Sequence, residues 1–171
     1  MKLIKSLLGA LGAAALSASP ALARVESNTG ELLKHISKAG VEVLINKNCN
    51  HRGGGYLGMY QYTSNLSQAR VTLCPGDTVD AEDHETVRHE VMHVIQSCVN
   101  LRRGTPPNTP VLDYDDLVKR VNSTVPSYDV DHIHSTYPQE KWAVEYEAFY
   151  AEYAFTATDL IELFDKACMK S

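Results

Sequence analysis

Residues 86–101 of this chain read T-V-R-H-E-V-M-H-V-I-Q-S-C-V-N-L, and this stretch predicts the active-site helix. At about 100° per residue, a helix places His93 about 40° and Glu90 about 100° away from His89. The apolar residues of the stretch gather on the opposite side of the same helix; they are Val87, Val91, Val94, Ile95 and Leu101. We therefore expect an amphipathic helix whose polar face turns two histidines and a glutamate toward a cleft.

The pentapeptide His89–His93, H-E-V-M-H, has the spacing of a zinc-binding motif. Two imidazoles one turn apart on one helix face can bind the same ion, and the glutamate beside them can act as general base toward water that the metal activates. We expect His89 and His93 to bind Zn²⁺ and Glu90 to be catalytic. The alternative, two surface histidines beside an ordinary glutamate, does not account for the opposed polar and apolar arcs.

A tetrahedral catalytic zinc needs a third protein ligand. The motif is not extended by a further Gly and His, because Gln96 and Val99 occupy those positions. The best source is the segment 140–149, E-K-W-A-V-E-Y-E-A-F, which predicts a downstream helix with candidate carboxylates at Glu145 and Glu147. Side chains two residues apart on a helix point about 200° away from each other, so only one of them can bind.

H-E-x-x-H followed by Glu145-Tyr-Glu-Ala148, in the pattern E-x-x-A, resembles the gluzincin metallopeptidases. In that family a glutamate on a later helix completes the zinc site, so the resemblance implies Glu145 rather than Glu147 as third ligand. It also implies a small zincin-like domain, and Ala148 leaves room for the histidine helix. This chain departs from the family at Phe149, where Asp or Asn is commonest and supplies a hydrogen bond behind the ligands.

The segment that precedes this helix holds candidates for stabilising an oxyanion. Between Pro126 and Pro138 we expect an irregular stretch, in which His132 and His134 would share one face of an extended backbone. Either of them, or one of Tyr128, Tyr137 and Tyr146, is a candidate donor. Loop histidines and buried tyrosines more often have no such role.

The first 23 residues predict an export signal. Lys2 and Lys5 precede the apolar run of residues 7–16, and Ala21-Leu22-Ala23 forms a small-x-small cleavage pattern, so we expect cleavage before Arg24. The apolar run is shorter than the roughly 20 residues that a membrane span requires. The sequence thus predicts a secreted or periplasmic protein of one domain, residues 24–171, with no stable membrane insertion after cleavage.

The four cysteines, Cys49, Cys74, Cys98 and Cys168, all follow the predicted signal. An even number in an oxidising compartment favours two disulfides. Of the three possible connectivities, we favour Cys74 with Cys98 and Cys49 with Cys168. None of the four has C-x-x-C spacing, and Cys98 points away from His93 on the same helix, so they are not expected to bind the zinc.

Charge argues against nucleic acid as a partner. The signal carries two of the 16 basic residues and none of the 21 acidic ones, so the remaining chain has a net charge of −7.

Sheet-forming segments at residues 41–45, 56–62 and 69–74, the last two as a hairpin, come before the helical segments. The sequence therefore predicts an α+β fold, with an antiparallel or mixed sheet followed by the active-site helix and a helical C-terminal part.

Together these features predict a secreted zinc-dependent peptidase that hydrolyses a peptide or protein substrate, with zinc held by His89, His93 and Glu145 and water activated by Glu90. The alternative is a non-catalytic zinc-binding protein or an inactive zincin-type fold that only binds. Neither alternative requires a free carboxylate at Glu90. The sequence does not indicate the substrate, its cleavage specificity or the oligomeric state.

Overall fold

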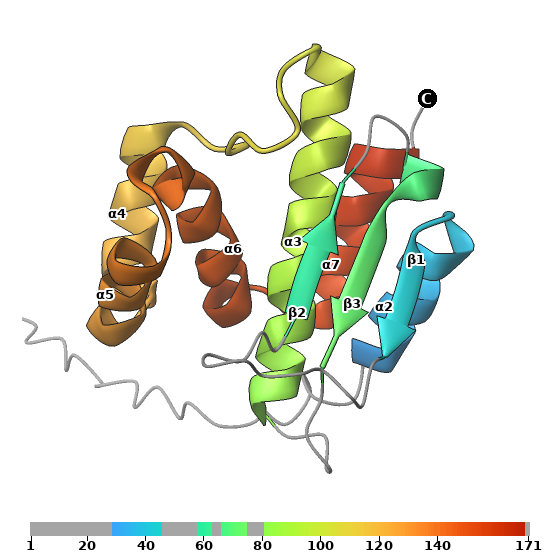
Figure 1. The fold of residues 1–171 in the computed structure, drawn as a ribbon, viewed down its shortest axis with the longest axis horizontal. Coiled ribbons are helices and arrows are strands. Elements are labelled where there is room, and N and C mark those ends of the chain that lie inside the picture. Colours follow the sequence, from blue (N-terminus) through green and yellow to red (C-terminus); the bar gives the residue numbers. More distant parts are fainter. Residues whose placement is uncertain (1–28, 46–57, 63–65, 75–80, 170–171) are drawn as a thin grey trace, which may run out of the picture.

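The computed structural model describes residues 29–45, 58–62, 66–74 and 81–169 (Figure 1). The predicted signal segment and Cys49 lie outside this part of the chain.

The long helix α3 (Ala81–Arg103) runs through the middle of the fold (Figure 1). On one side of it lie the sheet, helix α2 (Thr29–Lys38) and helix α7 (Ala157–Phe164) with its π-helical continuation η3 (Asp165–Met169). On the other side lie α4 (Tyr114–Thr124), α5 (Ser127–Thr136) and α6 (Trp142–Ala154), which follows the 3-10 turn η2 (Gln139–Lys141). Helix α3 is thus the element that both halves of the fold share.

The sheet is small and mixed. Strands β1 (Glu42–Ile45), β2 (Gly58–Gln61) and β3 (Arg70–Leu73) have the order β1-β3-β2, with β3 parallel to β1 and antiparallel to β2. A 3-10 turn, η1 (Leu66–Gln68), precedes β3. Val71 and Leu73 alternate inward along the central strand, as the period of two requires. The predicted α+β class, mixed sheet and antiparallel pairing of β2 with β3 are confirmed.

Two hydrophobic clusters fill the interior, one on each side of α3. The first joins α2, the sheet, one face of α3 and α7, and includes Ile36, Val91 and Phe164, all 0% exposed. The second joins α4, α5 and α6 around Leu117 and Ile133. The aromatic residues at helical spacing on α6 pack in or against this second cluster; they are Trp142, Tyr146, Phe149 and Tyr153. Their rings therefore belong to the core on this side of α3.

Helix α3 is buried on both of its faces rather than on one. Val91 and Ile95 are buried as predicted, but His89, Glu90 and Gln96 on the polar face are buried too, because α6 packs against that face. The predicted apolar arc is wrong at its end. Leu101 is 37% exposed, since α3 extends past the core to Arg103.

Two further predictions are corrected. Residues 127–136 form α5 rather than an irregular stretch, because Ile133 anchors a helix in the second cluster and Pro126 is compatible with the position before its first turn. Cys98 is bonded to Cys168, which contradicts both favoured pairings. This bond ties the end of α3 to η3, and Cys74 is also in a disulfide.

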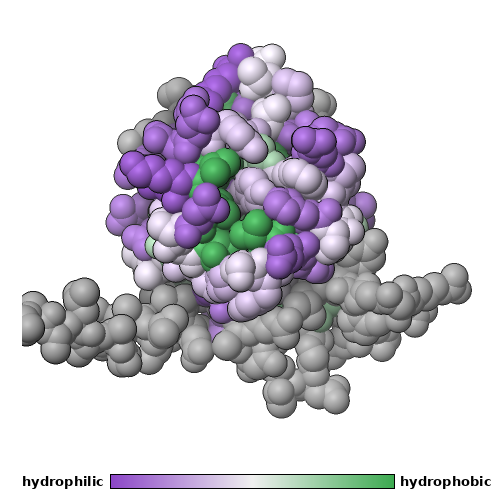
Figure 2. All heavy atoms as spheres, turned by 90° about the vertical axis from the view of Figure 1, so that its left-hand side faces the viewer, coloured by the Kyte–Doolittle hydropathy of each residue, from purple (hydrophilic) through white to green (hydrophobic). Residues whose placement is uncertain are grey.

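The face on the α4 and α5 side is mostly hydrophilic, with small hydrophobic areas between polar side chains (Figure 2). In the described part of the chain, no helix is both long and apolar enough to cross a membrane.

Candidate metal centre

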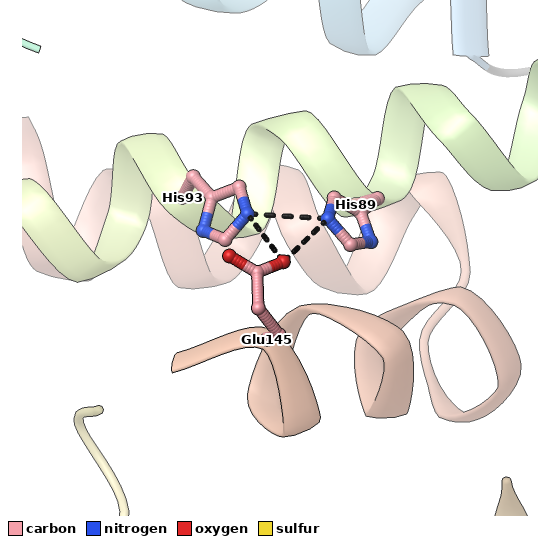
Figure 3. A group of neighbouring side chains, drawn as sticks. All are labelled: His89, His93 and Glu145. Atoms are coloured by element: carbon pink, nitrogen blue, oxygen red, sulfur yellow. Dashed lines mark hydrogen bonds and ion pairs between the residues drawn. The ribbon is translucent and has the colours of Figure 1, made fainter. Parts of the chain in front are cut away.

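Three side chains from α3 and α6 meet at one point (Figure 3). His89 and His93 project from consecutive turns of α3, and Glu145 reaches them from α6. The Nε2 atoms of the two histidines are 3.1 Å apart, and Glu145 Oε2 is 3.4 Å from that of His89 and 3.6 Å from that of His93. The structure thus assembles one group of three ligand atoms that can hold a metal ion.

The triangle of ligand atoms has the size that zinc requires. Zinc bonds of about 2.0–2.1 Å in a tetrahedral site imply neighbouring donors about 3.3–3.4 Å apart. The observed edges of 3.1, 3.4 and 3.6 Å bracket that value without any rearrangement of the helices. The donor set, two imidazole nitrogens and one carboxylate oxygen, is also one that catalytic zinc sites use.

Hydrogen bonds behind the ligands fix the protonation of both histidines. His89 Nδ1 lies 2.6 Å from Glu152 Oε1, and His93 Nδ1 lies 2.7 Å from Gln96 Oε1. A carboxylate or amide oxygen only accepts, so each Nδ1 donates a hydrogen. The lone pair of each neutral ring is therefore on Nε2, the atom that faces Glu145.

The orientation of Gln96 is itself fixed. Its Nε2 donates to the carbonyl oxygen of Val144 at 3.0 Å and to Glu147 Oε2 at 2.9 Å, so its Oε1 must be the atom that faces His93. Gln96 is 1% exposed, and water cannot substitute for these partners. Helix α6 therefore determines, through one amide, which nitrogen of His93 is available to a metal.

With both rings neutral, three electron-pair donors therefore converge with no hydrogen between them. Glu145 Oε2 is buried and has no hydrogen-bond partner, because both contacts to the imidazole nitrogens are too long. A buried carboxylate oxygen opposite two lone pairs is unfavourable unless a cation lies between them. The residues present therefore fit a bound metal ion.

The pKa values of these groups also indicate that a positive charge is favourable at this site. Burial lowers the pKa of His89, but the carboxylates of Glu145 and Glu152 outweigh it and raise this pKa well above 6.5. Burial raises the pKa of Glu145, but the two histidines outweigh it and lower this pKa to about 2. In the metal-free protein, a proton on His89 thus takes the place of the cation.

Glu147, the other carboxylate considered as ligand, points away from this group. Its oxygens accept hydrogen bonds from the backbone N–H groups of Val111 and Leu112, both at 2.8 Å, and from Gln96. It is 1% exposed and holds the segment that leads into α4 against α6. The structure brings Glu145, and not Glu147, to the histidines.

Glu90 is buried on α3, 6% exposed, close enough to His89 and His93 to feel their charge. Burial raises its pKa above 4.5, against the lowering effect of His89 and His93. Gly58 of strand β2 makes room for it. A Cβ at Gly58 would come within 2.8 Å of Glu90 Oε1 and 2.6 Å of Thr86 Cγ2.

The predicted oxyanion donors are separated by α5. His134 is hydrogen-bonded to the Tyr146 hydroxyl and lies against Trp142, which leaves both rings in a structural contact. Tyr128 is 66% exposed. The expected shared face of His132 and His134 is wrong, because residues two apart on a helix diverge.

Among these candidates, Tyr137 alone lines the cavity that opens next to His93 and Glu145. His132 packs instead against the rings of Phe149 and Tyr137.

Sequence reasoning missed the two residues that orient the histidines. Glu152 follows Glu145 by two helical turns, and this spacing was the available signal that it would lie on the same face of α6. It provides the hydrogen bond that Phe149 does not, while the Phe149 ring packs edge-on against His89 with centroids 4.9 Å apart.

Comparison with known proteins identifies no relative. No protein-family model matches the chain, and neither a curated protein nor a solved structure matches it significantly.

Proposed function

We propose that this protein is a secreted zinc-dependent peptidase of the gluzincin type. His89, His93 and Glu145 hold the metal, and Glu90 is the general base. The observation that carries the proposal is the convergence of two Nε2 lone pairs and a buried, unpaired carboxylate oxygen within 3.1–3.6 Å of one another.

When bound, zinc supplies a Lewis acid that polarises the carbonyl of the substrate and lowers the pKa of water toward neutrality. Glu90 accepts the proton of the attacking water and returns it to the leaving amine. The raised pKa of the buried Glu90 carboxyl makes it a stronger base than an exposed glutamate. Glu152 and Gln96 keep the two imidazoles in the tautomer and orientation that the metal needs.

Among the described strands, β2 lies at an edge of the sheet, and this edge offers a place for the substrate backbone. β2 is an edge strand that packs against α3 and carries Gly58 next to Glu90. An extended peptide can add to such an edge by backbone hydrogen bonds, which would bring its scissile bond near the metal group.

Export is part of the proposal. The N-terminal segment has the pattern of a cleavable signal, and the Cys98–Cys168 disulfide is consistent with an oxidising compartment. A secreted or periplasmic peptidase would encounter peptide or protein substrates there.

The test separates metal binding from chemistry. The purified protein should contain one zinc ion per chain, and the His89→Ala, His93→Ala double variant should contain none. Glu90→Gln should retain zinc, while cleavage of a broad peptide library falls by about 100-fold or more, because the amide cannot accept the proton. Glu140→Gln, on an exposed residue of η2, is the control for loss of a carboxylate.

Two results would contradict the proposal. If Glu90→Gln and the unaltered protein cleave equally, Glu90 is not the base. If the zinc-loaded, unaltered protein cleaves no peptide in the library, the site is that of a metal-binding protein without peptidase activity.

A further inference from the structure

A cavity of about 370 Å³ opens beside the metal group, and His93 and Glu145 form part of its wall. Its volume is near the lower end of the roughly 300–1,000 Å³ found for small-molecule sites. Such a space can take one or two residues rather than a long peptide. Because two of the three ligand side chains line it, the substrate residue next to the cleaved bond is the part that would enter.

Most of the wall is aromatic or apolar. These side chains come from β2 and the residue that follows it, from the segment before α4, from the two residues before η2 and from the first turn of α6; they are Tyr60, Tyr62, Pro107, Tyr137, Pro138 and Val144. Tyr60 also lies nearly parallel to the His93 ring, with an interplanar angle of 15° and centroids 6.4 Å apart. These side chains suit the hydrophobic part of a ligand.

Lys141 supplies the remaining charge in this wall. It is half-buried, it lies one turn before Glu145, and none of the ion pairs found in the described part of the chain includes it. The other charged group of the wall, Glu145, is committed to the metal group. A partly buried ammonium without a counter-ion in an apolar wall favours a ligand that brings a negative charge.

We infer that the cavity binds a substrate residue bearing a carboxylate, and that Lys141 is the specificity-determining residue that pairs with it. This inference rests on the proposed peptidase function. The carboxylate can come from a free C-terminus or from an Asp or Glu side chain, and these two sources share the same chemistry at Lys141.

Binding of matched acids and amides tests this assignment without turnover. In the zinc-loaded Glu90→Gln protein, calorimetry compares N-acetyl-phenylalanine with its C-terminal amide, and N-acetyl-glutamate amide with N-acetyl-glutamine amide. The first pair reports a free C-terminus and the second an acidic side chain. Lys141→Met and Lys141→Arg are made in the same protein, and Lys119→Met, on an exposed residue of α4, is the control.

With Lys141 present, one acid should bind about tenfold or more tightly than its amide, as expected for a charge-assisted hydrogen bond. Lys141→Met should abolish this preference, Lys141→Arg should keep most of it, and Lys119→Met should leave it unchanged. The preference should also weaken at high salt. Zinc content and circular dichroism show that each variant is folded.

Several results overturn the inference. A preference that survives in Lys141→Met places the carboxylate elsewhere, for example on the metal. Equal binding of acid and amide, or no detectable binding of either acid, also rejects the site. If cleavage still depends on Glu90 in those cases, the proposed peptidase function stands and only the carboxylate specificity fails.

Discussion

Replacing the carboxylate by an amide should impair different properties at Glu145 and at Glu147, although the two residues are close neighbours on α6. Glu145 Oε2 faces two imidazole nitrogens and accepts no hydrogen bond. Glu147 accepts three hydrogen bonds and contacts neither histidine ligand. We therefore expect Glu145→Gln to impair metal binding and Glu147→Gln to impair folding.

The magnitude for Glu145→Gln follows from the loss of one of three ligands and of its charge. Removing even a partner behind a ligand typically weakens metal binding 10–100-fold, so the loss of Glu145 should weaken it by at least about 100-fold. A 100-fold weaker affinity removes about 2.7 kcal/mol of zinc-dependent stabilisation.

For Glu147→Gln, an amide has one oxygen where the carboxylate had two. The N–H groups of Val111 and Leu112 and the amide of Gln96 all donate to this side chain, so at least one buried donor must face another donor. Each such loss costs about 1–3 kcal/mol, and the bonds that remain are no longer charge-assisted, which gives about 2–4 kcal/mol in total. For a chain of this size the Tm should fall by about 5–15 °C.

Thermal unfolding with zinc and with excess chelator separates the two effects, and zinc content after dialysis gives an independent measure. Glu145→Gln should lose the difference between the two Tm values, whereas Glu147→Gln should keep the difference and lower both. Glu140→Gln, an exposed carboxylate on η2, is the control. The reasoning is refuted if Glu147→Gln, and not Glu145→Gln, lowers zinc content, since Glu147 would then be the ligand.

Three further predictions concern the surroundings of the ligands. Gln96→Leu and Glu152→Gln should each weaken zinc binding about 10–100-fold in a chelator competition, since each disturbs the Nδ1 hydrogen bond of a histidine. Unchanged zinc affinity in both variants would show that these hydrogen bonds do not orient the rings. Zinc affinity should fall as the pH is lowered, because a proton competes with zinc for His89. The fall should begin well above pH 6.5, since burial lowers the pKa of His89 but Glu145 and Glu152 raise it by more. A zinc affinity that is constant between about pH 6 and 8 contradicts this. The denatured, unreduced protein should contain no free thiol, because all four cysteines are expected in two disulfides; two or more titratable thiols would contradict this. The Cys98→Ser, Cys168→Ser double variant should be less stable by about 2–4 kcal/mol in urea unfolding, because the bond closes a loop of 70 residues; unchanged stability would contradict this.

Much of the fold was predictable because its signals are local. Strands β1, β2 and β3 each lie within the predicted segments 41–45, 56–62 and 69–74. The segment of α5 was misjudged because its hydrophobic periodicity is weak. What makes it helical is the burial of Ile133 against residues of α4 and α6, which is a tertiary contact.

The metal group was also predictable from the sequence only in part. The spacing of His89 and His93 follows from the geometry of one helix, so the sequence alone determined that both rings lie on one face. The choice between Glu145 and Glu147 was open on local grounds, because each lies on the same helix and the resemblance to a family supplied the preference. The packing of α6 on α3 decided it, since that packing turns Glu147 toward Gln96 and the segment before α4.

The sequence by itself determined the H-E-x-x-H helix, the α+β class and the even number of cysteines, because periodicity, residue spacing and composition are properties of the chain. Only the tertiary structure decided that Cys98 pairs with Cys168, that Glu152 and Gln96 orient the two histidines, and that Lys141 lines a cavity at the metal group. Each of these depends on which faces of separate helices meet. That meeting is set by the burial of two hydrophobic clusters on either side of α3, which no local pattern encodes.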